Sequence, residues 1–309
     1  MARSTRAGIE LSGSVLRYAA ITRSGDAFEL QRLGRCDFEF DAARLLQAEE
    51  ADETALEDVS GALRDVFKGL EVAHLYVALP PSCGVQFFAP VDRSATPTER
   101  NEALHWQATQ LRTEEAGPFK MVVCNLDDPG EHERDEEAEW HHVIAVDRAV
   151  QERFTRIAGV VDPDVRPRFR GTMLAGYEVG TRIVAGDEIG AEEGSAHELL
   201  VGAYRDRCEI TLSHNGRWRA ATVADGSDAD ESVYQAARLL EEVGLEPDVL
   251  DRLYTYGSAA EELAEGRFGE IFVDREERLD PFQAINIEAE TVSEGFAHWE
   301  YVPALGVTL

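Results

Sequence analysis

The hydrophobic pattern begins with three short apolar runs that are separated by turn residues. Residues 7–11, 15–22 and 27–33 have the composition of strands, and Ser12-Gly13-Ser14 and Ser24-Gly25-Asp26 lie between them. Connections this short join neighbouring antiparallel strands. The pattern therefore predicts an antiparallel meander of three strands at the start of the chain.

Helical and strand patterns then alternate. An apolar stripe predicts a helix over residues 53–67, and the apolar run 75–79 predicts a buried strand that returns to the same sheet. Thr96-Pro97-Thr98-Glu99 is a capping box with proline at the first helical position, which predicts a helix from there to about residue 112. Residues 120–125 and 142–146 are predicted to be paired strands.

The second half repeats this order of elements. Asn215-Gly216, a strong hairpin pattern, lies between two of its apolar runs. The elements predicted in the remaining chain are helices over 147–159 and 169–181, strands over 197–204, 208–213 and 218–223, a helix over 231–243, a strand over 253–256, a helix over 259–265 and a strand over 271–273. Each half thus begins with a meander followed by helix, strand and helix. This duplication predicts an α/β protein with an actin-like (ribonuclease H-like) fold of two related lobes.

Composition suggests where the halves divide. Residues 185–195 are rich in glycine and acidic residues, which is typical of a linker. We therefore expect a first lobe over residues 1–185 and a second over 186–309. The apolar end of the chain, about 296–309, is expected to pack back on the body.

Charge narrows the set of partners. The 309 residues include 60 Asp and Glu against 30 Lys and Arg, a net charge of −30, and Lys68 and Lys120 are the only lysines. Such a chain is repelled by phosphate backbones and anionic lipid, which disfavours nucleic-acid binding. The acidity indicates a halophilic protein, because molar salt screens self-repulsion. The alternative explanation is an acidic protein from a GC-rich genome, in which arginine replaces lysine for coding reasons.

Other sequence features favour a cytoplasmic protein without direct membrane insertion. There is no run of about 18 apolar residues and no apolar segment behind the basic N-terminus. The cysteines, at positions 36, 83, 124 and 208, form no C-x-x-C pair, and this spacing favours reduced thiols.

Three polar or aromatic features have structural explanations. The acidic run 131–139 is interpreted as a solvated hairpin tip, with a cation site as the alternative. His141 and His142 are neighbours in a predicted strand, so their side chains face opposite ways and no metal site is predicted. Trp106 is expected in the core or at a subdomain contact. P-loop and Gly-x-Ser-x-Gly motifs are absent from the sequence.

Four stretches, in matching order along nearly the whole chain, resemble the PilM family, the cytoplasmic actin-like components of type IV pilus assembly. That family is related to FtsA and to the cytoplasmic part of GspL. The similar stretches are GIELSGSVLR at residues 8–17, LYVALP at 75–80 with ALHWQA at 103–108, NGR at 215–217, and DPFQ at 280–283 with ALGVTL at 304–309. The resemblance implies a small α+β subdomain inserted in the first lobe at about residues 86–146.

The resemblance also identifies two hairpin turns that hold nucleotide phosphates in actin-like ATPases. At the first turn, Glu10 replaces the family's Asp and Ser12 its first Gly, whereas Gly13 and Ser14 preserve a tight turn and Arg17 a positive charge. Small residues matter there because backbone amides must approach the phosphate.

The second turn departs further. Gly202-Ala203-Tyr204 stands where the family has "DIG", so the acid is lost and a bulky ring replaces glycine. The adenosine-side "GG" becomes Tyr256-Gly257. We therefore predict no catalytic residues, no metal ligands and little or no ATPase activity. Residual binding of ATP with Mg²⁺ stays open, at Ser12, Gly13, Ser14, Arg17 and Gly257.

The resemblance implies a non-catalytic scaffold at the cytoplasmic face of the inner membrane, within a type IV pilus or type II secretion-like assembly. Its expected partners are the N-terminal peptide of a PilN-like membrane protein, bound in the first lobe near the inserted subdomain, and other assembly proteins. A functional actin-like ATPase and a sugar-kinase-like enzyme are the alternatives.

Overall fold

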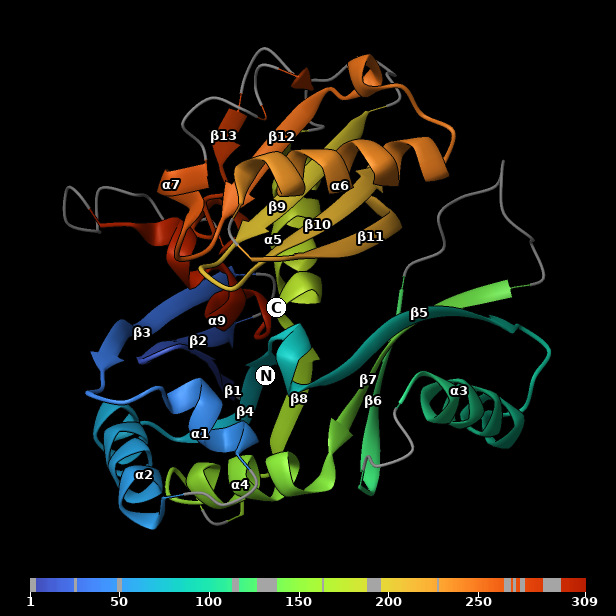
Figure 1. Ribbon diagram of the computed structural model, residues 1–309. Coiled ribbons are helices and arrows are strands. Elements are labelled where there is room, and N and C mark those ends of the chain that lie inside the picture. The colour runs from blue at the N-terminus through green and yellow to red at the C-terminus, as the bar shows by residue number, and fades with distance from the viewer. Residues whose placement is uncertain are drawn as a thin grey trace. The chain divides into compact units, whose positions relative to one another are not determined.

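The computed structural model describes residues 4–24, 27–48, 52–112, 117–126, 138–162, 164–187, 196–226, 228–263, 268, 271–272, 276–285 and 296–309. The chain forms two compact units that divide between Thr172 and Met173. Figure 1 shows both, and each is considered by itself. No helix in the described part of the chain is long and apolar enough to cross a membrane.

The first unit is built on a five-stranded sheet with the order β3-β2-β1-β4-β8. Its strands are β1 (Ser4–Ser12), β2 (Val15–Ser24), β3 (Ala27–Asp37), β4 (Val72–Leu79) and β8 (Pro167–Gly171). The first three form the predicted antiparallel meander, and β4 and β8 add parallel to β1. The meander prediction is therefore confirmed.

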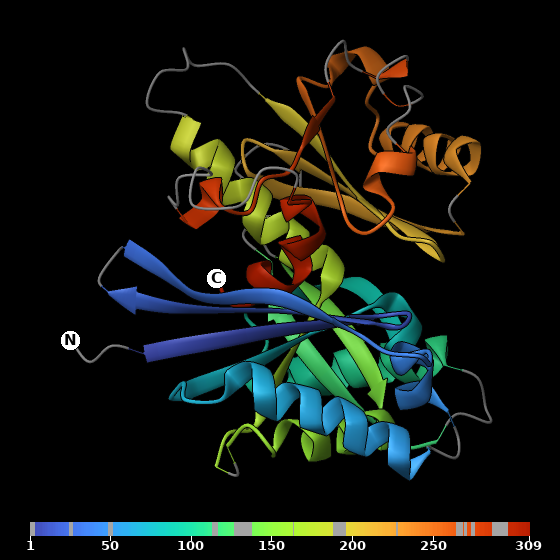
Figure 2. The same ribbon diagram turned by 90° about the vertical axis from the view of Figure 1, so that its left-hand side faces the viewer.

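Helices bury apolar faces against this sheet. They are α1 (Ala42–Gln47), α2 (Glu53–Phe67) and α4 (Arg148–Ala158). Asp52 caps α2 by accepting from the Thr54 and Ala55 amides, and Leu56, Val59 and Leu63 are buried in the core of the unit. Figure 2 shows α2 along one face of the sheet.

A small subdomain is inserted after β4. A 3₁₀ turn, η1 (Pro81–Cys83), leads into it, and β5 (Gly84–Asp92), α3 (Pro97–Leu111), β6 (Phe119–Asn125) and β7 (Ala138–Asp147) follow. The three strands form an antiparallel sheet with the order β5-β7-β6. The predicted capping box of α3 is present at Thr96 and Glu99, and the predicted pairing of β6 with β7 is confirmed.

His142 joins the inserted subdomain to the first sheet. It lies on β7, stacks on Phe88 with 4.9 Å between ring centroids, and has its Nε2 3.1 Å from Gln86 Oε1. A Cβ on Gly171 of β8 would lie 2.6 Å from His142 Cε1. Burial lowers the pKa of His142 to about 4, so the ring is neutral at pH 7.

The second unit repeats the first sheet, with the order β11-β10-β9-β12-β13. Its strands are β9 (His197–Ala203), β10 (Arg207–His214), β11 (Arg217–Asp225), β12 (Arg252–Tyr256) and β13 (Glu276–Arg278). Asn215 and Gly216 have φ of 53° and 68°, the two positive values that a type I′ hairpin requires. β12 and β13 add parallel to β9, as β4 and β8 do to β1.

The other elements of this unit include four helices and three 3₁₀ turns among the described residues. The helices are α5 (Thr172–Asp187, whose first residue belongs to the first unit), α6 (Ala229–Glu242), α7 (Ala260–Leu263) and α9 (Val302–Gly306). The 3₁₀ turns are η2 (Pro247–Val249), η3 (Gln283–Ile285) and η5 (His298–Tyr301). Asp228 caps α6 by accepting from the Asp230 and Glu231 amides. Every residue of α9 is buried, and Trp299 packs against the second core.

Two element predictions were wrong, and one strand was missed. Residues 169–171 belong to β8 and the helix begins only at Thr172, because the strand pairs with β4 in the same sheet. Residue 271 is helical and not in a strand, and β13 pairs with β12 instead. The strand β5 was not predicted at all. Its sequence lacks regular apolar alternation. Its burial is determined by β7, which pairs with it, and by α3, which packs on the same small core.

Two predicted segments fall mostly on residues that are not described. They are the acidic hairpin tip at 131–139, of which only 138 and 139 are described, and the linker at 185–195, of which α5 covers 185–187. The lobes 1–185 and 186–309, the insert at about 86–146 and the packing of the tail 296–309 stay our proposal for the domain organisation.

Protonation of His142 should destabilise the first unit. The folded pKa is about 4 and the unfolded value is about 6.5, so only the unfolded chain gains a proton between these pH values. Stability from this residue is complete above pH 6.5 and falls as the pH drops toward 4, by about 3 kcal/mol in total. His142→Asn should remove this part of the pH dependence. Denaturant unfolding of the wild type and of His142→Asn at pH 7 and pH 5 measures the loss of unfolding free energy. An equal loss in the two proteins between these pH values would contradict the prediction.

Candidate functional site

The first hairpin turn, between β1 and β2, is tight and small. Ser12 pairs with Val15, which leaves Gly13 and Ser14 as the two central residues. Gly13 has a φ of 56°, a conformation that favours glycine, and a Cβ there would meet no atom within 4 Å. Backbone conformation, and not crowding, therefore selects glycine at this position.

The turn is anchored to the segment that leads into α1. The Phe38 amide donates to the Ser14 carbonyl at 2.8 Å, and the Ala43 amide donates to the Gly13 carbonyl at 3.1 Å. These bonds use both central carbonyls of the turn. The sequence prediction placed Ser12, Gly13 and Ser14 in one turn, and the structure has them there.

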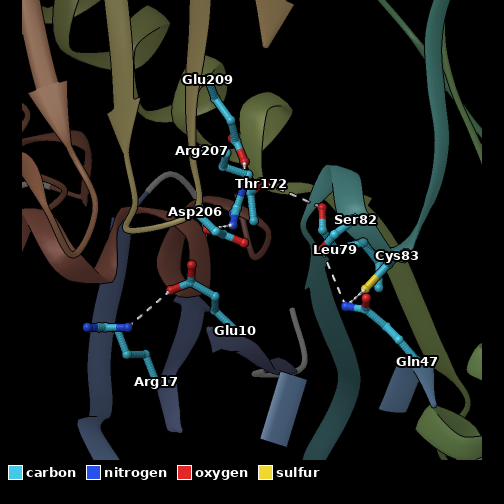
Figure 3. Close-up of polar contacts among 10 residues, drawn as sticks. All are labelled: Glu10, Arg17, Gln47, Leu79, Ser82, Cys83, Thr172, Asp206, Arg207 and Glu209. Atoms are coloured by element: carbon cyan, nitrogen blue, oxygen red, sulfur yellow. Dashed lines mark hydrogen bonds and ion pairs between the residues drawn. The ribbon is translucent and has the colours of Figure 1, made fainter. Parts of the chain in front are cut away.

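Arg17, the fourth predicted residue of this hairpin, faces an acid. It is the register partner of Glu10 across the β1–β2 pair, and its Nη1 lies 3.9 Å from Glu10 Oε2. Both side chains are buried, with exposed fractions of 4% and 1%, and Figure 3 shows the two facing each other. The charge of Arg17 is therefore balanced by Glu10 within the hairpin itself.

The second hairpin turn connects β9 to β10. Ala203 pairs with Cys208, and the Tyr204 amide donates to the Arg207 carbonyl at 2.9 Å, which leaves Arg205 and Asp206 exposed at the tip. The Tyr204 side chain is buried, with an exposed fraction of 1%. A ring thus lies within this turn, where a phosphate-binding turn requires open backbone amides.

Arg207 contacts three other residues in and beside this turn. Its Cζ lies 3.8 Å from the centre of the Tyr204 ring, its Nε donates to Glu209 Oε1 at 2.7 Å, and its Nη1 donates to Asp206 Oδ1 at 3.0 Å. Figure 3 shows Arg207 between the two carboxylates. We call Tyr204, Asp206, Arg207 and Glu209 the turn cluster. It combines a cation–π contact with charge-assisted hydrogen bonds.

The cluster keeps its charges although Arg207 and Glu209 are buried. Burial alone would lower the pKa of Arg207, but the negative charge of Glu209 and its neighbours overcomes this and holds the pKa above its usual value. Cys208, between the two, has its pKa raised to about 12 by burial, so its thiol stays protonated. The guanidinium is directed at the chain's own carboxylates rather than at an external anion.

Gly257, the predicted adenosine-side residue, is required by the backbone. It has a φ of 96°, and a Cβ there would lie 2.4 Å from the Ala203 carbonyl oxygen. The chain then turns back so that the Ala259 amide donates to the same carbonyl at 3.0 Å. The preceding Tyr256 ring fills the space beside Gly202, whose Cβ would lie 2.7 Å from that ring. Local packing thus accounts for glycine at both positions.

The candidate metal residues do not converge. Among the described residues, no group of three or more His, Cys, Asp and Glu side chains is placed to hold a metal ion. His141 Nε2 lies 3.5 Å from Glu139 Oε2, whereas His142 contacts Gln86 and Phe88. The two rings therefore have different partners.

A second candidate site is a groove on the inserted subdomain, which we call the α3–β6 groove. It encloses about 730 Å³ and is lined by Thr98, Asn101, Glu102, His105, Trp106, Thr109, Lys120, Met121 and Val123. Trp106 is 64% exposed, so of its two predicted places, the core or a subdomain contact, the core is wrong. Leu104 and Ala108 make the buried face of α3, and the Trp106 ring extends from another face.

The two repeated lobes, each with a five-stranded mixed sheet, and the insert in the first lobe define an actin-like α/β fold, as the sequence predicted. A chain of a PilM–PilN type IV pilus biogenesis complex superposes with a TM-score of 0.68 over 98% of this chain and 97% of that chain, at 16% sequence identity. A Bacteroides thetaiotaomicron protein with an actin-like ATPase fold and unknown function gives 0.57 over 92% and 96%, at 11% identity. The fold assignment depends on these two.

The cytoplasmic domain of EpsL, an inner-membrane component of the Vibrio cholerae type II secretion system, superposes more loosely. Its TM-score is 0.47 over 94% of this chain and 97% of that chain, at 17% identity. No family model matches the sequence. No curated protein matches it by sequence either.

Sequence reasoning missed the acid beside the second turn. The resemblance puts the family's acid at the position of Gly202, where this chain has none. Glu209 is the register partner of Gly202 on the neighbouring strand. Arg207 and Glu209 are two residues apart on a strand and therefore share a face, which was a usable pattern. The stacking of Arg207 on Tyr204 depends on the turn between them and had no such pattern.

Breaking the turn cluster should destabilise the second unit strongly. Glu209→Leu leaves a buried guanidinium with less compensation, and we expect a loss of about 3–5 kcal/mol in unfolding free energy. The double variant Arg207→Met with Glu209→Leu should lose less, because it leaves no buried charge. Denaturant unfolding in molar KCl compares them.

The matched control for that comparison is Glu242→Gln in α6. Glu242 pairs with Arg238, and both side chains are more than half exposed, so little change is expected. A single variant Glu209→Leu that is as stable as the double variant would contradict the account of the cluster.

Proposed function

We propose that this protein is a non-catalytic scaffold of a type IV pilus or type II secretion-like assembly. The observation that carries the proposal is the turn cluster within a complete actin-like fold. Both sheets keep the full strand order of the fold, yet the second phosphate turn holds its own arginine and tyrosine. The fold is preserved although the second turn has lost its phosphate-binding character, which supports a role in assembly rather than in catalysis.

Hydrolysis of a nucleotide needs three things from these turns. Backbone amides must reach the phosphates, charge must be neutralised, and a metal and water must be positioned. In this chain Arg17 is paired with Glu10 and Arg207 with Glu209. The buried arginine of each hairpin is therefore paired with a carboxylate of the same hairpin before any phosphate arrives.

The proposed partner is a PilN-like inner-membrane protein, together with other proteins of the same assembly. The structural similarity to a PilM–PilN complex supports this choice. We infer that a short N-terminal peptide of that partner docks on the first lobe near the insert, and that the protein works at the cytoplasmic face of the inner membrane. A basic or apolar peptide suits a chain with a net charge of −30.

A nucleotide-binding actin-like protein is the second candidate function. The observation in its favour is the first turn, where a Cβ on Gly13 would meet no atom within 4 Å and Ser12 and Ser14 are small. Under this alternative, Ser12, Gly13, Ser14, Arg17 and Gly257 would hold ATP with Mg²⁺.

Magnesium nucleotide should leave the thermal midpoint of the protein unchanged. A ligand present at about 100 times its dissociation constant stabilises the folded state by about 2.7 kcal/mol, which a melting curve detects readily. Melting in molar KCl with Mg-ATP, and with magnesium chloride alone as the control, makes the measurement. A clear shift, or ATP turnover that Glu10→Gln abolishes, would refute the scaffold proposal in favour of the second candidate.

The intact chain, tagged and expressed at high salt in its own host, should capture an inner-membrane protein of a pilus or secretion assembly. Mass spectrometry of the captured proteins identifies it, and an untagged strain is the control. The scaffold proposal fails if the gene lies outside any pilus or secretion neighbourhood and no such protein is captured.

A further inference from the structure

We propose that a cationic patch on the first sheet binds an acidic, extended segment of a partner protein. We call Arg6, His74, Tyr76, Arg168 and Arg170 the β4–β8 patch. This goes beyond the proposed function and does not rest on it, because the patch is defined by its own contacts and not by a kind of assembly. Figure 1 shows β4 and β8 side by side in the first sheet.

The patch lies on the face of the first sheet that is opposite its helices. Neighbouring residues of a strand point to opposite faces. Val77 and Phe169 are buried in the core that α1, α2 and α4 share with the sheet. The residues that alternate with them face the other way, and the register places Tyr76 of β4 beside Arg168 of β8. Arg170, two residues further along β8, shares this face.

One aromatic ring positions two guanidinium groups of the patch. Arg168 Cζ lies 5.8 Å and Arg170 Cζ 5.4 Å from the centre of the Tyr76 ring. Arg168 Nη1 also donates to the Tyr76 hydroxyl at 3.4 Å. Tyr76 is buried, whereas Arg168 is exposed and Arg170 is half-buried. The ring therefore orders both guanidinium groups before a partner binds, which reduces the entropy cost of binding.

The two arginines of β8 have no acid of their own chain to neutralise them. In the described part of the chain, no carboxylate pairs with Arg168 or Arg170. Asp162 and Asp164 precede the strand, and Asp162 accepts from the Asp164 amide. Other arginines of the first unit do pair with acids: Arg17 with Glu10, Arg35 with Asp37, Arg148 with Glu152 and Arg156 with Glu53.

The field at the patch is positive although the whole chain has a net charge of −30. Arg6 is the register partner of His74 across the β1–β4 pair. Burial, and then the positive charges of Arg168 and Arg6, lower the pKa of His74. The share of the two arginines in this shift indicates a local positive field, which attracts an acidic ligand.

Spacing and charge favour an extended acidic segment as the occupant. Residues two apart on a strand are about 6.6 Å apart, and carboxylates at alternate positions of an extended peptide have the same spacing. Each guanidinium can bind a carboxylate through two parallel N–H···O bonds. A second copy of this chain carries another −30 charges, and a nucleic acid is repelled by the rest of the surface, so both fit less well.

The test uses a synthetic peptide that alternates glutamate and threonine, and its control peptide has glutamine in place of glutamate. Titration calorimetry with the intact chain measures the affinity of each. The buffer holds about 1 M KCl, where the Debye length is about 3 Å, so that contacts rather than the long-range field are measured. We expect the glutamate peptide to bind and the glutamine peptide not to bind.

The double variant Arg168→Gln with Arg170→Gln should weaken binding at least about tenfold, because it removes both guanidinium groups. Its matched control is Arg35→Gln with Arg148→Gln, which changes the net charge equally at two exposed ion pairs of the same unit and should keep full affinity. Arg168→Lys with Arg170→Lys keeps the charge but loses the paired N–H geometry, so its affinity should lie between the two. Thermal melting checks that each variant folds.

Equal binding of the glutamate and glutamine peptides to the wild type would overturn the inference, and this comparison needs no variant. Full affinity in either substituted form of the patch, or an equal loss in the matched control, would overturn it as well. An oligonucleotide of equal charge that binds more tightly than the glutamate peptide would make a nucleic acid the occupant. Self-association in sedimentation that Arg168→Gln with Arg170→Gln abolishes would make it a second copy of the chain. Either result would overturn the assignment to an acidic segment of another protein.

Discussion

Each lobe depends on one central strand that is paired in two different ways. β1 pairs antiparallel with β2 on one side and parallel with β4 on the other, and β9 does the same with β10 and β12. An antiparallel neighbour can follow through a tight turn, whereas a parallel neighbour needs a crossover helix. This constraint fixes the order of meander, helix and strand. It also brings the second hairpin turn and Gly257 together, where Gly257 approaches the Ala203 carbonyl.

The acidity of the chain has two separate consequences. Most of the 60 acidic residues can lie on a solvated surface that suits high salt, and their abundance says nothing about chemistry. Glu10 and Glu209 are different, because they are buried and each faces an arginine of its own hairpin. Buried pairs of this kind cost desolvation free energy and are weak evidence for stability. Their position beside the turns supports the view that the buried arginine of each hairpin is neutralised by a carboxylate of the same hairpin.

The inserted subdomain differs from the lobes in the surface it leaves open. The first lobe buries an extensive core beneath α2 and α4, whereas the insert has a small core around Ala89, Leu104 and Val143. Among the described residues, β6 is an edge strand of the three-stranded sheet, and the α3–β6 groove lies beside it.

The sequence alone determined the local structure and, through it, the fold class. Apolar periodicity, the capping box at Thr96 and the Asn215-Gly216 turn predicted the elements because these preferences act between near neighbours. The resemblance to PilM placed Ser12, Gly13, Ser14, Arg17 and Gly257 in or beside two turns, and their role in binding stays a prediction. In the structure Ser12, Gly13 and Ser14 form the first turn, Arg17 lies on β2 beyond it, and Gly257 follows β12.

Tertiary structure decided the partners of those residues. The first strand of the insert, the true start of α5 at Thr172 and the exposure of Trp106 depend on which neighbours cover each element. Likewise, only folding sets Arg207 between Tyr204 and Glu209, because a buried charge is compensated by whatever the turn brings within reach. Spacing along the chain specifies turns and faces, whereas contacts between side chains at a turn are specified by the packed fold.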